Sequence, residues 1–166
     1  LSKFRALLGA AAEPVAAARP TATNLRAAVS RGLDAADGAA SPEAACAALL
    51  ESATSLADYE REASDAIGRH GASWFREKGG IEGRHAFLTH CNAGALATTG
   101  IGTALAPIYV MHAAGAAVHV FVDETRPLLQ GLRLTAYELA RAGVPFTVIP
   151  DAAAAGLLRN GEIDAV

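Results

Sequence analysis

The sequence has 166 residues, enough for one domain or for a small domain with part of another. Hydrophobic residues make up 52% and charged residues 19%, so burial can offset the entropy cost of folding and intrinsic disorder is not expected. The formal net charge of -3 provides no basic surface for nucleic acid, which excludes that class of partner.

The two cysteines, Cys46 and Cys91, form neither a C-x-x-C pair nor a disulfide framework, which favours a reducing, cytoplasmic location. The opening residues have no apolar segment with a cleavage site, so no secretory signal is expected. Residues 104–122 are almost free of charge but contain Pro107 and change periodicity partway. We interpret them as a helix followed by a buried strand, and we expect no membrane partner.

Residues 1–80 are predicted to be a helical N-terminal region, because Ala, Leu, Glu and Arg dominate them. Arg-Pro at residues 19–20 interrupts the first apolar stripe, since proline fits poorly inside a helix. Ser-Pro-Glu at residues 41–43 combines a capping serine, a proline at the first helical position and an acid near the positive helix end. This pattern predicts one long helix from residue 41 to about Phe75.

Residues 81–166 alternate between apolar strand-like runs and helical segments. In chain order they are a strand at 86–90, a helix from about Thr98, a strand at 118–122, a helix at 132–142, a strand at 145–149, a helix at 152–158 and the start of a strand at 163–166. Repeated strand–helix units predict an α/β, Rossmann-like parallel sheet covered by helices. Because the last unit stops at Val166, we expect this domain to be incomplete and the sequence to be part of a longer protein.

Polar residues follow three of the predicted strands. His90, Cys91 and Asn92 lie at the end of the first strand, residues 123–126 follow the second, and Asp151 follows the third. Binding sites of doubly wound sheets lie at these carboxyl ends. A cysteine between a strand and a helix amino terminus can have its thiolate stabilised there, although a lone cysteine is more often a buried, inert residue.

Two cofactor hypotheses are weak. Gly94, Gly100 and Gly102 could let an anion approach backbone amides, and Asp123 follows as a ribose-binding acid would. These glycines lie too far past the first strand for a dinucleotide turn, so no cofactor is predicted. His90 beside Cys91 could suggest zinc, but no further ligands occur at metal spacing, so no metal is predicted.

Three segments match sequence motifs of one known protein family. Residues 89–98 read T-H-C-N-A-G-A-L-A-T and are similar to the family's T-H-C-N-x-G-A-L-A-T. Residues 123–131 read D-E-T-R-P-L-L-Q-G and resemble D-E-T-R-P-x-x-Q-G. Residues 19–25 read R-P-T-A-T-N-L and resemble R-P-T-A-x-N-L. Their order and spacing agree, from about Arg19 to Val166. The chain therefore resembles the methylthioribose-1-phosphate isomerases.

The resemblance implies a homodimer of two-domain subunits, with a smaller helical N-terminal domain and a Rossmann-like C-terminal domain. It also implies an isomerase that converts the sugar phosphate 5-methylthioribose 1-phosphate to 5-methylthioribulose 1-phosphate in methionine salvage. By this match Cys91 takes the position of the active-site cysteine, while Arg19 and Gln130 take those of substrate-binding residues. We place Asn92 and Gly94, from the cysteine segment, with the substrate-binding residues. Without the resemblance, Arg19 would be a solvated cation and Gln130 an ordinary loop residue.

The resemblance also implies elements that this sequence does not contain. The family's catalytic acid occurs in a G-A-D stretch one strand after Val166, and an R-G-A-P segment would precede Leu1. Asp151 is followed by Ala152, where the family commonly has Asn or Ser. Two alternatives share the fold: ribose-1,5-bisphosphate isomerases, which usually lack the A-L-A-T run, and regulatory subunits of the translation initiation exchange factor, which lack the T-H-C-N cysteine.

Overall fold

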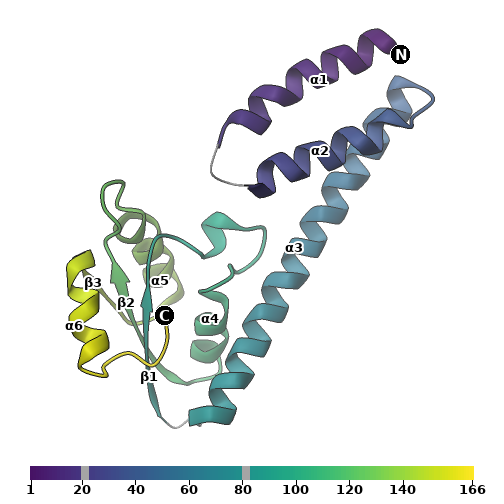
Figure 1. The fold of residues 1–166 in the computed structure, drawn as a ribbon. Coiled ribbons are helices and arrows are strands. Elements are labelled where there is room, and N and C mark those ends of the chain that lie inside the picture. Colours follow the sequence, from purple (N-terminus) through teal and green to yellow (C-terminus); the bar gives the residue numbers. More distant parts are fainter. Residues whose placement is uncertain (20–22, 80–82) are drawn as a thin grey trace. The chain divides into compact units, whose positions relative to one another are not determined.

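A computed structural model describes residues 1–19, 23–79 and 83–166. The chain divides into two compact units, Leu1–Tyr59 and Glu60–Val166, and each is described by itself. Figure 1 shows the elements in chain order.

The described secondary structure of the first unit consists of helices joined by short turns. It contains α1 (Ser2–Ala17), α2 (Thr23–Asp37) and the first part of α3 (Pro42–Gly79). Helices α1 and α2 pack against each other, and Arg5 on α1 pairs with Asp37 at the end of α2, with 3.4 Å between Nε and Oδ1. The interruption predicted at Pro20 lies outside the described residues.

The long helix α3 begins where the sequence predicts. The Ser41 hydroxyl accepts a hydrogen bond from the amide of Ala44 at 3.2 Å, which satisfies one of the unpaired donors of the first turn. Pro42 occupies the first helical position. The capping interaction predicted from residues 41–43 is therefore confirmed, and the helix runs a few residues beyond Phe75, to Gly79.

The second unit contains a three-stranded parallel sheet in the order β1-β2-β3. Its strands are β1 (Arg84–Thr89), β2 (Ala117–Asp123) and β3 (Phe146–Ile149). Leu88 is in register with Phe121, and Val122 with Val148. The predicted α/β fold with a parallel sheet is confirmed, and parallel pairing brings the carboxyl ends of the strands to one edge.

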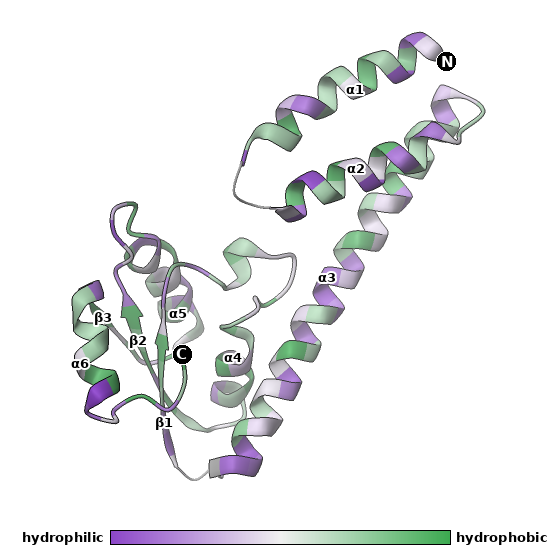
Figure 2. Cartoon of the chain, viewed as in Figure 1, coloured by the Kyte–Doolittle hydropathy of each residue, from purple (hydrophilic) through white to green (hydrophobic). Residues whose placement is uncertain are grey.

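The core of this unit lies between the sheet and the helices α3, α4 (Ala106–Ala113) and α5 (Ala136–Ala142). Figure 2 shows hydrophobic residues along β2 and a mixture of hydrophobic and hydrophilic residues along α3. The buried apolar residues of this core are Ala72, Phe87, Leu105, Ile108, Met111, Ala116, Val118, Val120, Val122, Leu139 and Val144. Close approach of α3 to α4 requires a small residue at Gly71, because a Cβ there would lie 2.4 Å from Pro107 Cγ. Helices α3 and α4 therefore pack tightly against each other at this point.

The predicted start of the helix that follows β1, at about Thr98, was wrong. Residues 95–97 form the short 3-10 helix η1 (Ala95–Ala97), and α4 begins only at Ala106. The intervening chain is held by long-range backbone contacts, with a bridge between Gly94 and Gly102 and a 2.9 Å hydrogen bond from the Thr103 amide to the Ala93 carbonyl. Gly102 has φ 107°, which a helix cannot contain.

Two other elements also differ from the prediction. The helix predicted at 132–142 consists of a π-helical turn, η2 (Gly131–Thr135), followed by α5. The helix predicted at 152–158 consists of η3 (Asp151–Ala153) and α6 (Ala154–Arg159). The strand predicted at 163–166 is reduced to one parallel bridge, between Ala165 and Phe87, because the Asp164 carboxylate itself accepts the Ala86 amide at 2.8 Å.

Among the helices in the described ranges, none combines the length and apolar character needed to cross a membrane. Residues 104–122 form α4 and β2, as interpreted from the sequence.

Candidate active site

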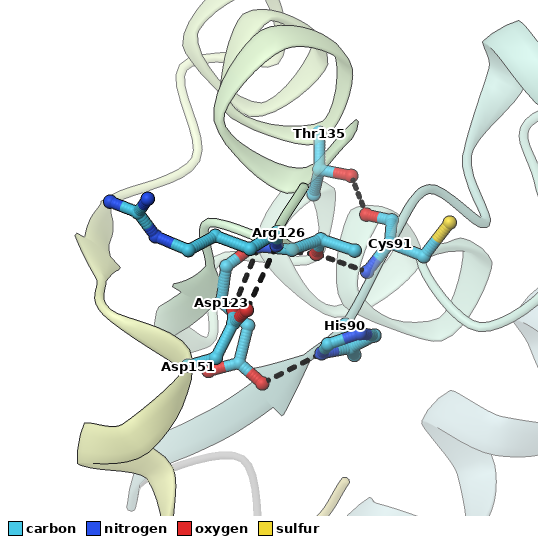
Figure 3. Close-up of polar contacts among 7 residues, drawn as sticks. His90, Cys91, Asp123, Arg126, Thr135 and Asp151 are labelled. Carbon is cyan, nitrogen blue, oxygen red and sulfur yellow. Dashed lines mark hydrogen bonds and ion pairs between the residues drawn. The ribbon is translucent and has the colours of Figure 1, made fainter. Parts of the chain in front are cut away.

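Cys91 lies just beyond the carboxyl end of β1, in a left-handed backbone conformation with φ 64°. The loop after β2 and the η2 turn hold its backbone on both sides. The Cys91 amide donates to the Thr125 hydroxyl at 2.8 Å, and the Cys91 carbonyl accepts from the Thr135 hydroxyl at 2.6 Å (Figure 3). The thiol is therefore carried by a backbone segment that its neighbours fix in position, and it is partly exposed.

His90, directly before Cys91, contacts the carboxylate at the end of β2. Its Nδ1 lies 3.0 Å from Asp123 Oδ2 (Figure 3). The Asp123 side chain is 7% exposed and that of His90 is 56% exposed. The pair therefore joins a buried acid to an accessible imidazole ring.

Asp151 lies just after the carboxyl end of β3, at the same edge of the sheet as Cys91 and His90. Its two carboxylate oxygens accept the backbone amides of Thr125 at 2.7 Å and Arg126 at 2.9 Å (Figure 3). These two hydrogen bonds, from Arg126 first and then Thr125, lower the pKa of Asp151, and the charges of His90 and Arg126 add to the effect. Asp151 thereby holds the loop that contacts Cys91.

His90, Asp123 and Asp151 offer possible metal-ligand atoms within 4.8 Å of one another. Hydrogen bonds within the protein already use four of these atoms: both Asp151 oxygens accept amides, and His90 Nδ1 contacts Asp123 Oδ2. We therefore interpret the group as a hydrogen-bonded network.

A buried glutamate on α5 anchors the loop that follows Cys91. Glu138 accepts the side-chain amide of Asn92 at 2.9 Å and the backbone amides of Ala95 at 2.7 Å and Leu96 at 3.0 Å. A Cβ at Gly94 would lie 2.1 Å from Glu138 Oε2, so only glycine lets the loop approach this carboxylate. The amides that could have received a bound anion are thus occupied by the protein's own carboxylate.

The Glu138 carboxylate has a fourth donor on α4. The Tyr109 hydroxyl donates to Glu138 Oε2 at 3.2 Å. Burial raises the pKa of Tyr109, and the charge of Glu138 and this hydrogen bond raise it further. The tyrosine therefore stays a neutral donor, and one carboxylate joins α4, α5 and the Cys91 loop.

Gln130 precedes η2 at a point where the chain passes very close to β2. A Cβ at Gly131 would lie 1.8 Å from the Asp123 carbonyl oxygen, so glycine is required there. Within the described part of the chain, the buried Gln130 Oε1 has no hydrogen-bond partner. That Gln130 and Cys91 face one pocket and bind substrate remains a prediction.

Arg19 lies in the first unit and is exposed. Its role in binding phosphate therefore remains a prediction, as do the substrate contacts of Asn92 and Gly94.

Sequence analysis missed Thr135 and Glu138, the two residues that hold the Cys91 segment from the η2–α5 side. A signal was present: Thr135 and Glu138 are three residues apart in a helical segment, next to the fully buried Leu139, so both lie near its apolar face. A buried carboxylate in such a place needs donors from elsewhere in the chain.

Curated relatives align with nearly all of this chain. A methylthioribose-1-phosphate isomerase from Gemmatimonas aurantiaca is 47% identical over 165 residues, which are 99% of this chain and 46% of the relative. A 5-deoxyribose 1-phosphate isomerase from Moorella thermoacetica is 46% identical, over 98% of this chain and 45% of the relative. The chain thus spans about half the length of the curated relatives it matches. These matches confirm the resemblance found in the three motifs.

Solved structures show the same fold. The 5-methylthioribose 1-phosphate isomerase of Pyrococcus horikoshii has a TM-score of 0.79 at 34% identity, covering 95% of this chain and 43% of that one. The delta subunit of translation initiation factor eIF-2B from A. fulgidus has a TM-score of 0.77 at 35% identity, covering 98% and 46%. A sequence profile of the initiation factor 2 subunit family matches residues 1–166, and the chain belongs to this family.

Proposed function

We propose that the whole protein is an aldose–ketose isomerase that converts 5-methylthioribose 1-phosphate to 5-methylthioribulose 1-phosphate, a step of methionine salvage. The observation that carries the proposal is Cys91 on a left-handed backbone segment at the carboxyl edge of the sheet, held by Thr125 and Thr135. The names of the sugar 1-phosphate isomerases that match this chain support the same activity.

The reaction explains which side chains are needed. A phosphate on C1 locks the sugar ring, so the ring must open with the help of an acid before a hydrogen can move from C2 to C1. We assign Cys91 to assisting that transfer and Arg19 to gripping the phosphate through its guanidinium fork. Gln130, Asn92 and Gly94 are proposed to bind the sugar. For Asn92 and Gly94 this would be in addition to their contacts with Glu138.

An assay on the full-length protein tests the proposal. The protein is incubated with 5-methylthioribose 1-phosphate, and ketose formation is followed by NMR of C1 and C2. We expect turnover that is lost in the Cys91→Ser variant. Absence of turnover by the wild-type protein would contradict the proposal.

The main alternative within the isomerases is a substrate with a different substituent at sugar C5, because one relative is named for 5-deoxyribose 1-phosphate. The same assay with 5-deoxyribose 1-phosphate and ribose 1,5-bisphosphate decides it by the ratio of kcat/KM values. We expect the methylthio substrate to be preferred.

A non-catalytic role as a subunit of an initiation exchange factor is the second candidate function, favoured by the likeness to the A. fulgidus delta subunit. The cysteine at position 91 argues against it, since the resemblance implies that regulatory subunits of the exchange factor lack the T-H-C-N motif. A full-length protein that isomerises none of the three sugars would favour this role.

We further propose that the protein is a cytoplasmic homodimer that needs no cofactor. We place the boundary between its helical N-terminal domain and its Rossmann-like domain near residue 80. Sedimentation of the full-length protein measures the oligomeric state.

A further inference from the structure

A histidine and an aspartate lie at the carboxyl ends of adjacent strands, next to the proposed active-site cysteine. His90 Nδ1 is 3.0 Å from Asp123 Oδ2. An ionised carboxylate can only accept a hydrogen bond, so Nδ1 is the donor, and this fixes Nε2 as the acceptor of the neutral ring. Figure 3 shows His90 and Cys91 side by side at this edge of the sheet.

Asp123 is a rigid anchor for the ring. Its backbone carbonyl accepts the Thr125 hydroxyl at 3.1 Å, and Gly131 lies so close to this carbonyl that a Cβ would clash with it. Its Oδ1 is buried without a partner among the described residues, so His90 is the group that compensates this carboxylate.

Other charged groups also lie near His90 and the loop that follows Asp123. Asp151, after β3, interacts electrostatically with His90. The nearby Arg126 guanidinium is paired with Glu124, with 2.7 Å between Nε and Oε1, so its charge is offset. The next residue along the chain, Cys91, carries a further titratable group, its thiol. Asp123, in contact with the ring, and Asp151 therefore offset the positive charge that the ring carries once it has taken a proton from substrate.

We propose that His90 is a second proton-transfer residue of the isomerisation, positioned by Asp123; this rests on the proposed function. When the ring opens, the C1–O bond breaks, and the ring oxygen keeps the electron pair and gains a proton. The hydrogen on C2 moves with its electron pair to C1, and the 2-hydroxyl loses its proton as C2 becomes a carbonyl. His90 Nε2 accepts that hydroxyl proton and releases it to water from its exposed ring, so the reaction needs no oxidant or reductant.

Three variants of the full-length protein test this role. We expect His90→Asn to lower kcat by about 10²–10⁴-fold, the usual worth of a general base, with little change in KM. Asp123→Asn should lower kcat less. In this variant the His90 ring loses the carboxylate that orients it but keeps its Nε2 atom. His119→Asn is the matched control, because the His119 ring is hydrogen-bonded to Thr147 within the sheet. This variant should keep wild-type kcat.

A rescue experiment separates chemistry from structure. We expect His90→Gly to regain turnover when imidazole is added to the buffer, whereas His119→Asn should not respond. A His90→Asn variant with wild-type kcat, or a His90→Gly variant that imidazole does not rescue, would overturn the assignment. Either result, with an active wild-type protein, leaves the proposed function intact; an inactive wild-type protein removes both.

Discussion

The Cys91 amide donates to the Thr125 hydroxyl at 2.8 Å, and both residues have left-handed backbone conformations, with φ 64° and 61°. Such conformations cost about 1–3 kcal/mol each for residues other than glycine, and they persist only where surrounding contacts impose them. They are least tolerated by β-branched residues such as threonine. The loops after β1 and β2 thus hold each other in conformations that neither would adopt alone.

Removing the Thr125 hydroxyl should therefore affect both stability and turnover. Thr125→Val keeps the shape of this buried side chain but leaves the Cys91 amide without its acceptor. We expect a loss of about 1–3 kcal/mol in the free energy of unfolding, the cost of an unsatisfied buried donor. Urea denaturation of the full-length protein measures it, with isomerase kcat measured alongside.

Thr147→Val is the control for this substitution. Thr147 is exposed on β3 and its hydroxyl contacts His119, so its loss should change stability by no more than about 0.5 kcal/mol. Equal losses of unfolding free energy in the two variants would show that the Cys91–Thr125 hydrogen bond stabilises the protein no more than an exposed contact does.

Cys91→Ser should abolish turnover without unfolding the protein. The exchange changes little volume, and the hydrogen bonds at this position are made by the Cys91 backbone, so they are retained. We expect unchanged unfolding in urea and a kcat below the detection limit. Cys46→Ser, at an exposed position on α3, should retain full activity. A Cys91→Ser enzyme with wild-type kcat would reduce Cys91 to a packing residue.

The parallel sheet could be predicted from the sequence because its signals are local. Apolar runs bounded by turn residues locate β1, β2 and β3, and the Ser41 cap locates the start of α3. The cysteine and the polar strand ends were also found, since a strand's end and its following residues are neighbours in sequence.

The contacts that shape the candidate site could not be predicted, because they join distant residues. Asn92 and Glu138 are 46 positions apart, and nothing near either of them indicates the other. The helix placed at Thr98 was wrong for a related reason: glycines at 100 and 102 serve close contacts with Ser64 and Gly94, and those contacts displace the helix start to Ala106.

Gly94→Ala should destabilise the loop that follows Cys91. The added Cβ would lie 2.1 Å from Glu138 Oε2, so the carboxylate must move and lose its contacts with the Ala95 and Leu96 amides. We expect a loss of about 1–3 kcal/mol in the free energy of unfolding, measured in urea, and a lower kcat.

Gly156→Ala provides the matched control, because no atom lies within 4 Å of its added Cβ and the residue belongs to α6. This substitution should raise stability by up to about 1 kcal/mol, since alanine favours a helix. If both alanine variants gained stability, the clash at Gly94 would be disproved.

Asp151 predicts a pH-dependent contribution to stability. Hydrogen bonds from the amides of Arg126 and Thr125 lower its pKa in the folded protein, with the charges of His90 and Arg126 adding to the shift. A carboxyl group whose folded pKa lies below its unfolded value stabilises the protein above the unfolded value, which is about 3.9. That stabilisation declines as the pH falls below about 3.9 and is lost once the pH has passed through the folded pKa.

Asp151→Asn should therefore lower the free energy of unfolding at neutral pH, because the amide group places an NH2 where a carboxylate oxygen accepts a backbone amide. Unfolding in urea, measured from pH 7 to pH 3, gives the difference between wild type and variant at each pH. We expect that difference to be constant from pH 7 to about pH 5 and to shrink as the pH falls through about 3.9 and below. The direction follows from the lowered pKa: protonation costs the wild-type protein its carboxylate, and the variant has none to lose. A difference that stayed constant down to pH 3 would mean that the Asp151 carboxylate does not stabilise the loop at residues 125–126.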